Sequence, residues 1–230
     1  MNEAPINWYI GFDQKESVSF HVLAHSIMRH ATRPIAVIPI HLGNLAGVFS
    51  RAPDGKQSNQ FSFSRFLVPW LNGFSGYAIW SDCDMLMRTD VSDLVKQVEY
   101  GKAVHVVKHD YVPKNSTKYL GATQYQYHRK NWSSMVVWNC AHWRNRCLTP
   151  DYVEKEIGMT LHQFRWLDDR YIGELPKEWN HLVGEYDPNP DAKLVHWTVG
   201  GPWFHEHENV EYSNDWREEL KLMTHSDQIK

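Results

Sequence analysis

The residues with the clearest chemical potential are two aspartates, Asp82 and Asp84, which directly follow the apolar run at residues 77–80. Alternate residues of a strand share a face, so both carboxylates can point to one side while Cys83 points to the other, toward the core. Two like charges this close favour a bound cation, and oxygen ligands select a hard divalent ion such as Mg²⁺, Mn²⁺ or Ca²⁺. A solvated turn is the alternative interpretation of the same pair.

A histidine and two glycines lie within and just after a second apolar run, at residues 194–197. Gly200 and Gly201 allow positive φ and close backbone approach, so their N–H groups could cradle phosphate oxygens. His196 would complete a metal site if the fold brings it to the two aspartates. The alternatives are a structural histidine and a tight turn.

The elements that must position these side chains alternate along the chain. Strands are predicted at residues 6–12, 35–40, 77–80, 103–107, 134–138 and 194–197, and helices at 14–30, 61–71, 91–98 and 214–223. Turn-rich segments at 51–59 and 187–191 predict surface loops. Strands that alternate with helices indicate a three-layer α/β domain, here one domain over residues 1–230, with a largely parallel sheet. Ligands of such sheets bind beyond the carboxyl ends of the strands.

Composition excludes several classes of protein. With 42% hydrophobic residues, 22% charged residues and a net charge of -3, the chain of 230 residues is not a disordered tail, a coiled coil or a strongly basic nucleic-acid binder. No apolar run approaches the roughly 20 residues of a membrane helix, and no secretory signal is visible. Three cysteines without a CxxC pair fit reduced thiols, so a cytoplasmic location is expected. The eleven tryptophans suit either a sugar-binding or base-binding surface or a filled core.

The motifs, taken in order, resemble the donor half of a retaining glycosyltransferase of the GT-A fold, and they are most similar to glycosyltransferase family 8, the glycogenin and lipopolysaccharide galactosyltransferase group. The resemblance runs from residue 6 to about residue 204. Its pieces are IGFD before Gln14, LAHSIMRH, FSRFLVPWL around Arg65, DCD with TDVSDL, SSMVVWN from Ser133, HQFRWLDD from His162, ELPKEWN from Glu174 and HWTVGGPW from His196.

This resemblance implies a GT-A (Rossmann-like) fold and transfer of a sugar from a nucleotide sugar, a UDP-sugar, to a glycan or other hydroxyl acceptor with retention. It implies Mn²⁺ (or Mg²⁺) as cofactor, while the charge and the short apolar runs predict neither a nucleic-acid partner nor a membrane span. The implied metal ligands are Asp82, Asp84 and His196, and the implied donor contacts are Gly11, Phe12, Asp13, Arg65, Ser133, Gly200, Gly201 and Trp203. Segment 111–130 is expected to form a lid or an acceptor-facing insertion.

Gln163 is the first candidate for the group beneath the anomeric carbon, and Asp168 is the second. Asp168 and Asp169 could instead begin the next element as a helix cap. The lysine of the family's last motif is absent, since Gly201 precedes Pro202. Residues 205–207 (HEH) are expected to be a solvated strand or loop rather than a second metal site.

Two other functions fit the same residues. A sugar nucleotidyltransferase shares the architecture and the acidic metal site, but it usually carries a Gly-rich basic loop after the first strand, where GFDQKES has one glycine. A non-catalytic glycan-binding protein would use the tryptophans and a structural Ca²⁺. Dependence of ligand binding on a nucleotide separates the glycan-binding protein from a transferase.

Overall fold

A six-stranded sheet forms the centre of the computed structural model, which describes residues 5–51, 59–114, 117 and 126–225. In spatial order its strands are β2 (Ile35–His41), β1 (Ile6–Phe12), β3 (Tyr77–Ser81), β6 (Met135–Asn139), β5 (Val104–Val106) and β7 (Ile172–Glu174). Pairs β1·β2, β1·β3 and β5·β7 are parallel, whereas β6 is antiparallel to both its neighbours. The predicted α/β class with a mostly parallel sheet is therefore confirmed, and β6 is the antiparallel strand.

A second, smaller sheet brings two distant parts of the chain together. Its order is β4 (Met85–Met87), β9 (Leu194–His196) and β8 (His181–Leu182). Strand β4 is antiparallel to β9, and its register places Met85 opposite His196. Because Met85 directly follows Asp84, this pairing carries the second aspartate to the histidine.

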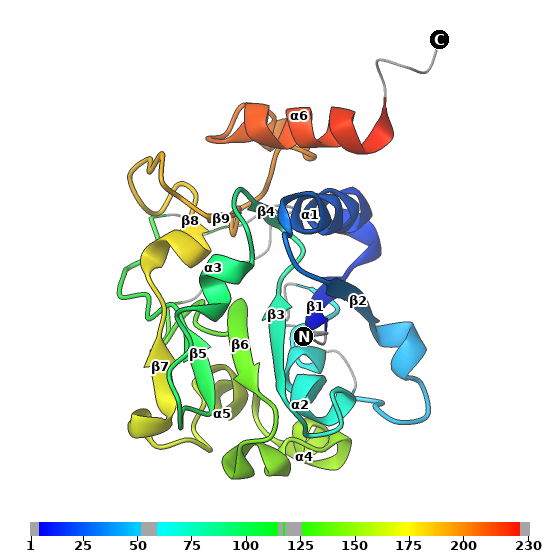
Figure 1. Cartoon of the computed structure of the whole chain (residues 1–230), viewed down its shortest axis with the longest axis vertical. Coiled ribbons are helices and arrows are strands. Elements are labelled where there is room, and N and C mark those ends of the chain that lie inside the picture. The colour runs from blue at the N-terminus through cyan, green and yellow to red at the C-terminus, as the bar shows by residue number, and fades with distance from the viewer. Residues whose placement is uncertain (1–4, 52–58, 115–116, 118–125, 226–230) are drawn as a thin grey trace.

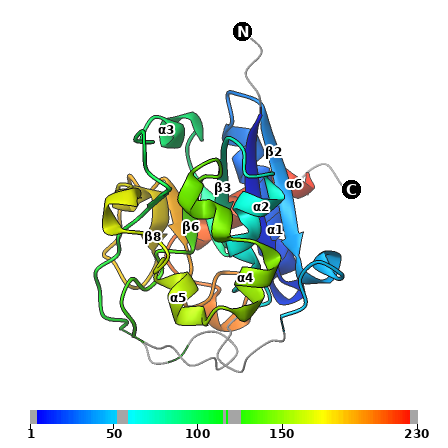
Figure 2. The same cartoon turned by 90° about the horizontal axis from the view of Figure 1, so that it is seen from below.

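Helices cover both ends of the molecule in Figure 1, where α1 and α6 lie at the top and α4 and α5 lie at the bottom, so α4 and α5 face the viewer in the view from below (Figure 2). The α-helices are α1 (Ser17–His30), α2 (Val68–Leu71), α3 (Ser92–Val95), α4 (Pro150–Lys155), α5 (Gly158–His162) and α6 (Ser213–Thr224). The 3₁₀ helices are η1 (Gln14–Glu16), η2 (Leu42–Leu45), η3 (Ser64–Leu67), η5 (Trp143–Cys147), η6 (Asp169–Tyr171), η7 (Lys177–Asn180) and η8 (His205–His207).

Two predicted helices are shorter than expected. The helix predicted at 61–71 begins as turns and the 3₁₀ helix η3 before the single turn of α2, although it buries Phe63, Phe66 and Leu67 as expected. The helix predicted at 91–98 is one turn, α3. In both places, tertiary packing of a few apolar side chains holds a segment too short to be a stable helix by itself.

Aromatic residues fill the core. Five tryptophans have at most 1% of their surface exposed, namely Trp8, Trp80, Trp138, Trp179 and Trp197. The core-filling interpretation of the tryptophan content therefore holds for these five. A separate apolar cluster under α6 joins Trp197 and Trp216, with Trp203 packed against it.

The loop predictions have mixed outcomes. The turn predicted at 187–191 is present, since the Ala192 N–H donates to the Asn189 carbonyl at 3.1 Å. Most of the loop predicted at 51–59, and half of the segment predicted at 111–130 to be a lid or insertion, lie outside the described residues. No helix within the described ranges is long and apolar enough to cross a membrane.

Candidate active site

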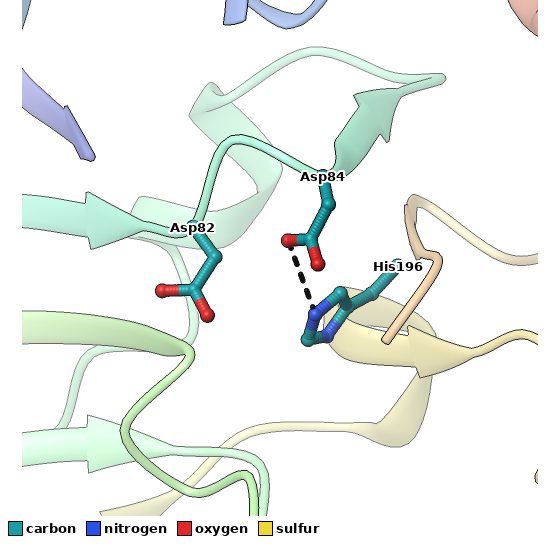
Figure 3. A group of neighbouring side chains, drawn as sticks. All are labelled: Asp82, Asp84 and His196. Atoms are coloured by element: carbon teal, nitrogen blue, oxygen red, sulfur yellow. Dashed lines mark ion pairs between the residues drawn. The ribbon is translucent and has the colours of Figure 1, made fainter. Parts of the chain in front are cut away.

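Asp82, Asp84 and His196 meet where the two sheets adjoin (Figure 3). Each offers one ligand atom, and these atoms all lie within 4.8 Å of one another. The Asp84 Oδ1 is 3.3 Å from the His196 Nε2. The three residues are 7%, 9% and 2% exposed, and Cys83 between the aspartates is completely buried. The two carboxylates share a side and Cys83 faces the core, as the spacing predicts.

Backbone hydrogen bonds fix the two aspartates from both sides. The Asp82 N–H donates to the Ser134 carbonyl at 2.9 Å, which ties the end of β3 to the start of β6. The Trp197 N–H donates to the Asp84 carbonyl at 2.9 Å, which ties the same segment to the end of β9. The segment that carries both carboxylates is thus held between the two sheets.

A buried asparagine sets the orientation of the histidine ring. Asn180, completely buried at the end of η7, uses its Nδ2 to donate to the Ser134 Oγ at 2.8 Å, so its Oδ1 acts as an acceptor. That Oδ1 lies 2.8 Å from the His196 Nδ1, which must therefore carry the proton. The Nε2 lone pair then faces Asp84, which is the arrangement that a metal-ligating histidine requires.

Arg65 balances the charge of the first aspartate. It is 5% exposed, and its Nη1 lies 2.9 Å from the Asp82 Oδ1 and donates to the Ser133 carbonyl at 2.9 Å. Its guanidinium carbon lies 5.6 Å and 5.4 Å from the ring centroids of Phe61 and Trp80. Among the described residues its buried Nε–H has no hydrogen-bond acceptor, so Arg65 retains a donor for an anionic ligand.

The donor set fits a divalent cation. Two carboxylate oxygens and one imidazole nitrogen suit Mg²⁺ or Mn²⁺, and the mixed O,O,N set favours Mn²⁺ over Ca²⁺. Twice the roughly 2.1 Å bond of a small divalent ion is about 4.2 Å, so small side-chain adjustments would bring all three atoms into contact with one ion.

The residues expected at the first strand have structural partners of their own. A Cβ on Gly11 would collide with the Phe61 ring, so this glycine permits close packing. Phe12 makes an edge contact with His41 at 5.4 Å between ring centroids. The Asp13 carboxylate accepts from the Lys15 N–H at 3.0 Å and from the Gln60 N–H at 3.1 Å, and so it caps η1 and anchors the start of the next described segment. Their donor contacts stay predictions.

Gly200 and Gly201 also make contacts within the chain. The Gly200 N–H donates to the Trp197 carbonyl at 3.1 Å, and its φ of 146° is a conformation that other residues rarely adopt. The face of Gly201 is filled by the ring of Trp203, which packs on Trp197 at 5.8 Å. A tight turn therefore accounts for the pair, and contact of its N–H groups with phosphate stays a prediction.

The two candidates for the anomeric centre differ in environment. Gln163, just after α5, is 4% exposed and its Oε1 accepts from the Arg165 Nε at 2.9 Å. Asp168 is exposed, directly precedes η6, and its Oδ2 lies 3.6 Å from the Arg170 Nη2. Its position as the residue before η6 agrees with the alternative of a helix start. Gln163 is thus buried and Asp168 is exposed, and the role of either at the anomeric centre stays a prediction.

His162 links Gln163 to the metal-ligand residues. Its Nδ1 is 2.8 Å from the Ser133 Oγ, and Ser133 in turn accepts from Arg65. Burial, followed by the charge of Arg65, lowers the pKa of His162 to about 3, so the ring is neutral at neutral pH. Residues 205–207 form the 3₁₀ helix η8 rather than the predicted strand or loop, and within the described ranges Asp82, Asp84 and His196 are the group that could hold a metal ion.

Two residues near the site were not singled out from the sequence. Asn180 acts through His196, yet 16 residues separate them and no local pattern joins them. His109 is 5% exposed, with its Nδ1 2.8 Å from the Tyr186 hydroxyl, and burial together with the nearby His196 lowers its pKa to about 3. It follows β5, so the rule that ligands lie beyond strand ends is the one signal that points to it.

Comparison with solved structures identifies the fold. WbbM, a bifunctional glycosyltransferase, matches 99% of this chain with a TM-score of 0.65 and 17% identity, and the glycosyltransferase GlyE of Streptococcus pneumoniae TIGR4 matches 99% with a TM-score of 0.62 and 14% identity. The chain spans 52% and 65% of these two proteins. The galactosyltransferase LgtC matches 95% of this chain and 96% of its own, with a TM-score of 0.61 and 11% identity. The protein therefore has the GT-A fold that its motifs predict.

The family is shown by a sequence relative. Protein CDI of Arabidopsis thaliana is 40% identical over 224 residues, which cover 94% of this chain and 86% of that protein. The chain belongs to the same family as Protein CDI. No protein-family model matches the sequence.

Proposed function

We propose that this protein is a metal-dependent glycosyltransferase that moves a sugar from a UDP-sugar to a hydroxyl acceptor with retention of configuration. The observation that carries the proposal is the buried trio of Asp82, Asp84 and His196 in a GT-A fold. We propose further that the chain forms one catalytic domain, because β3 of the large sheet and β9 of the small sheet both contribute to this trio.

The charges of the site suit a nucleoside diphosphate. Two carboxylates and the Arg65 guanidinium leave one net negative charge among these buried groups. A divalent ion in that position would reverse the balance to one net positive charge and would supply Lewis-acid stabilisation of the leaving diphosphate. Arg65, held between Asp82 and Ser133, would present its buried Nε–H to the same anion.

Each remaining residue is assigned a positioning task. Asn180 holds His196 in the tautomer whose Nε2 can accept a metal bond. Neutral His162 and Ser133 support Arg65 from the other side. We assign Gln163 to the position beneath the anomeric carbon, where its side chain would touch the oxocarbenium-like centre of the donor sugar during a retaining transfer.

The first test is nucleotide binding by calorimetry. We expect UDP to bind in the presence of Mn²⁺, more weakly with Ca²⁺, and not measurably in excess EDTA. The matched variant Asp84→Asn removes one ligand charge at nearly constant volume and should abolish the effect of the metal. Equal UDP binding with Mn²⁺ and with EDTA would overturn the proposal.

The second test is turnover. Incubation with a panel of nucleotide sugars and Mn²⁺ should give slow, Asp84-dependent hydrolysis of one UDP-sugar, and this assay requires no acceptor. Formation of UDP-sugar from UTP and a sugar 1-phosphate would instead identify a nucleotidyltransferase. Metal-dependent glycan binding that ignores UDP would identify a non-catalytic glycan-binding protein.

A further inference from the structure

A cleft that is not lined by Asp82, Asp84 or His196 has a volume of about 400 Å³. It is lined by His128, Arg129, Gln163, Arg165 and Leu167. This lining has two arginines, one histidine and no acidic side chain, although the chain as a whole carries a net charge of -3. Its size is within the range of small-molecule sites. The cleft is therefore a local concentration of positive charge in an acidic protein.

A continuous set of contacts connects this cleft to the trio. Asp82 is paired with Arg65 at 2.9 Å, Arg65 donates to the Ser133 carbonyl at 2.9 Å, and the Ser133 Oγ is 2.8 Å from the His162 Nδ1. His162 directly precedes Gln163, which lines the cleft. Gln163 is thus the cleft end of this path, and Asp82 is its other end.

The two arginines of the cleft are held differently. Arg129 is fixed, since its Nη1 donates to the Gln163 carbonyl at 2.8 Å, its Nη2 pairs with Asp169 at 2.5 Å, and its guanidinium carbon lies 5.1 Å from the Trp132 ring centroid. Arg165 is exposed and is held through its Nε alone, 2.9 Å from the Gln163 Oε1. Within the described part of the chain, the two terminal nitrogens of Arg165 make no hydrogen bond.

We propose that this cleft binds an anionic group, a phosphate monoester or a carboxylate, carried by the acceptor. Arg165 would supply the principal contact, because its terminal nitrogens form a planar fork that matches both kinds of oxyanion. The existing pair between Arg129 and the exposed Asp169 carboxylate is the same kind of contact within the chain. Asp169 would compete with the bound anion for Arg129, so Arg165 is the arginine that remains available to the anion.

The proposal rests on the proposed function, because it names the acceptor class of that site. An acceptor anchored by Arg165 would lie next to Gln163, since the Arg165 Nε holds the Gln163 side chain. Arg165 would then both recognise the acceptor and position the group assigned to the anomeric centre. A neutral sugar would gain neither the ionic contact nor the steering toward the cleft.

The test measures acceptor binding without donor and without metal. The probes are glucose 6-phosphate, glucuronate and glucose, titrated by NMR at low ionic strength against the wild type, Arg165→Gln and Arg146→Gln. Arg146 is an exposed arginine that does not line the cleft, so its variant makes the same charge change elsewhere. We expect at least one anionic sugar to bind about tenfold or more tightly than glucose, with the gain lost in Arg165→Gln and kept in Arg146→Gln. Which sugar binds identifies the anion.

Three results would overturn the inference: equal binding of all three sugars, anion binding unchanged in Arg165→Gln, or an equal loss in Arg146→Gln. Calorimetry of UDP with Mn²⁺ on the same wild-type sample keeps the two proposals separate. Absence of UDP binding with intact anion binding would refute the proposed function alone, and the reverse pattern would refute the acceptor class alone. A melting curve for each variant verifies that it is folded.

Discussion

Removal of the Asn180 side chain tests how His196 is prepared to bind a metal. In Asn180→Ala, the His196 Nδ1–H loses its acceptor at 2.8 Å, so the ring is free to rotate or to change tautomer. Partners of this kind typically contribute a factor of 10 to 100 to metal affinity, or about 1.4 to 2.7 kcal/mol. We therefore expect Mn²⁺ in the presence of UDP to bind about 10- to 100-fold more weakly.

The same substitution also reduces stability. Asn180 is completely buried, and its truncation leaves the His196 N–H without its acceptor, whereas the Ser134 hydroxyl loses one donor but still donates to the Asn131 carbonyl at 2.7 Å. A buried polar group left unsatisfied costs about 1–3 kcal/mol, so we expect a loss of about 1–3 kcal/mol in the free energy of unfolding. The metal titration must therefore be compared with a variant of similar stability.

Asn145→Ala is that matched control. Asn145 is also completely buried, and its Nδ2 donates to the Ala103 and Asn139 carbonyls at 2.9 Å each, away from the trio. It should lose similar stability while binding Mn²⁺ as the wild type does. Asn180→Asp keeps an acceptor for His196 and should retain metal affinity. The reasoning fails if folded Asn180→Ala binds Mn²⁺ normally, or if Asn145→Ala loses as much metal affinity.

Four further predictions test other parts of the molecule. Asp84→Ala should reduce donor hydrolysis below detection while the melting temperature changes little, because it removes a metal ligand and a like charge; wild-type rates would show that the aspartate pair is only a turn. Transfer from an α-linked donor should give an α-linked first product by NMR, and a β-linked product would contradict retention. Gln163→Ala should lower kcat far more than it weakens UDP binding, and a loss confined to UDP affinity would contradict the assignment of Gln163 to the anomeric centre. Burial alone would raise the pKa of Glu219, but hydrogen bonds from Arg29 and His25 lower it below its usual range. The stability that these contacts add is present above about pH 4.5 and is lost as the pH falls through the lowered pKa of the folded state. Thermal melts between pH 7 and pH 3 should therefore show a steeper loss of stability in acid for the wild type than for Glu219→Gln.

The sequence alone determined the class of fold and singled out the three residues that the structure brings together, Asp82, Asp84 and His196. Apolar periodicity located β1, α1, β2, β3 and α6, because these elements are long or regular enough for a pattern to be visible. The i and i+2 spacing of Asp82 and Asp84 placed both carboxylates on one side, since alternation along an extended chain is a local property. The order of the motifs then indicated His196 as the third ligand.

Tertiary structure decided what holds those ligands. Strands β4, β8 and β9 are two or three residues long, which is too short for alternation to specify a partner, and β4 and β8 were not predicted at all. Asn180 meets Ser134 across 46 residues, and this contact depends on how the two sheets pack. The packing of Gly11 against Phe61 likewise shows that a glycine at a strand end can serve the core.

The sequence did not predict the basic cleft either, although Gln163, which lines it, was a candidate site residue. Gln163 was singled out as a candidate for the anomeric centre, but nothing local shows that Arg129 and Arg165 would converge on it from segments more than 30 residues apart. Local patterns report how a residue lies relative to its own strand or helix. Which side chains share a cleft is set by packing between elements, and for this protein that packing decides both the support of the metal ligands and the charge of the neighbouring cleft.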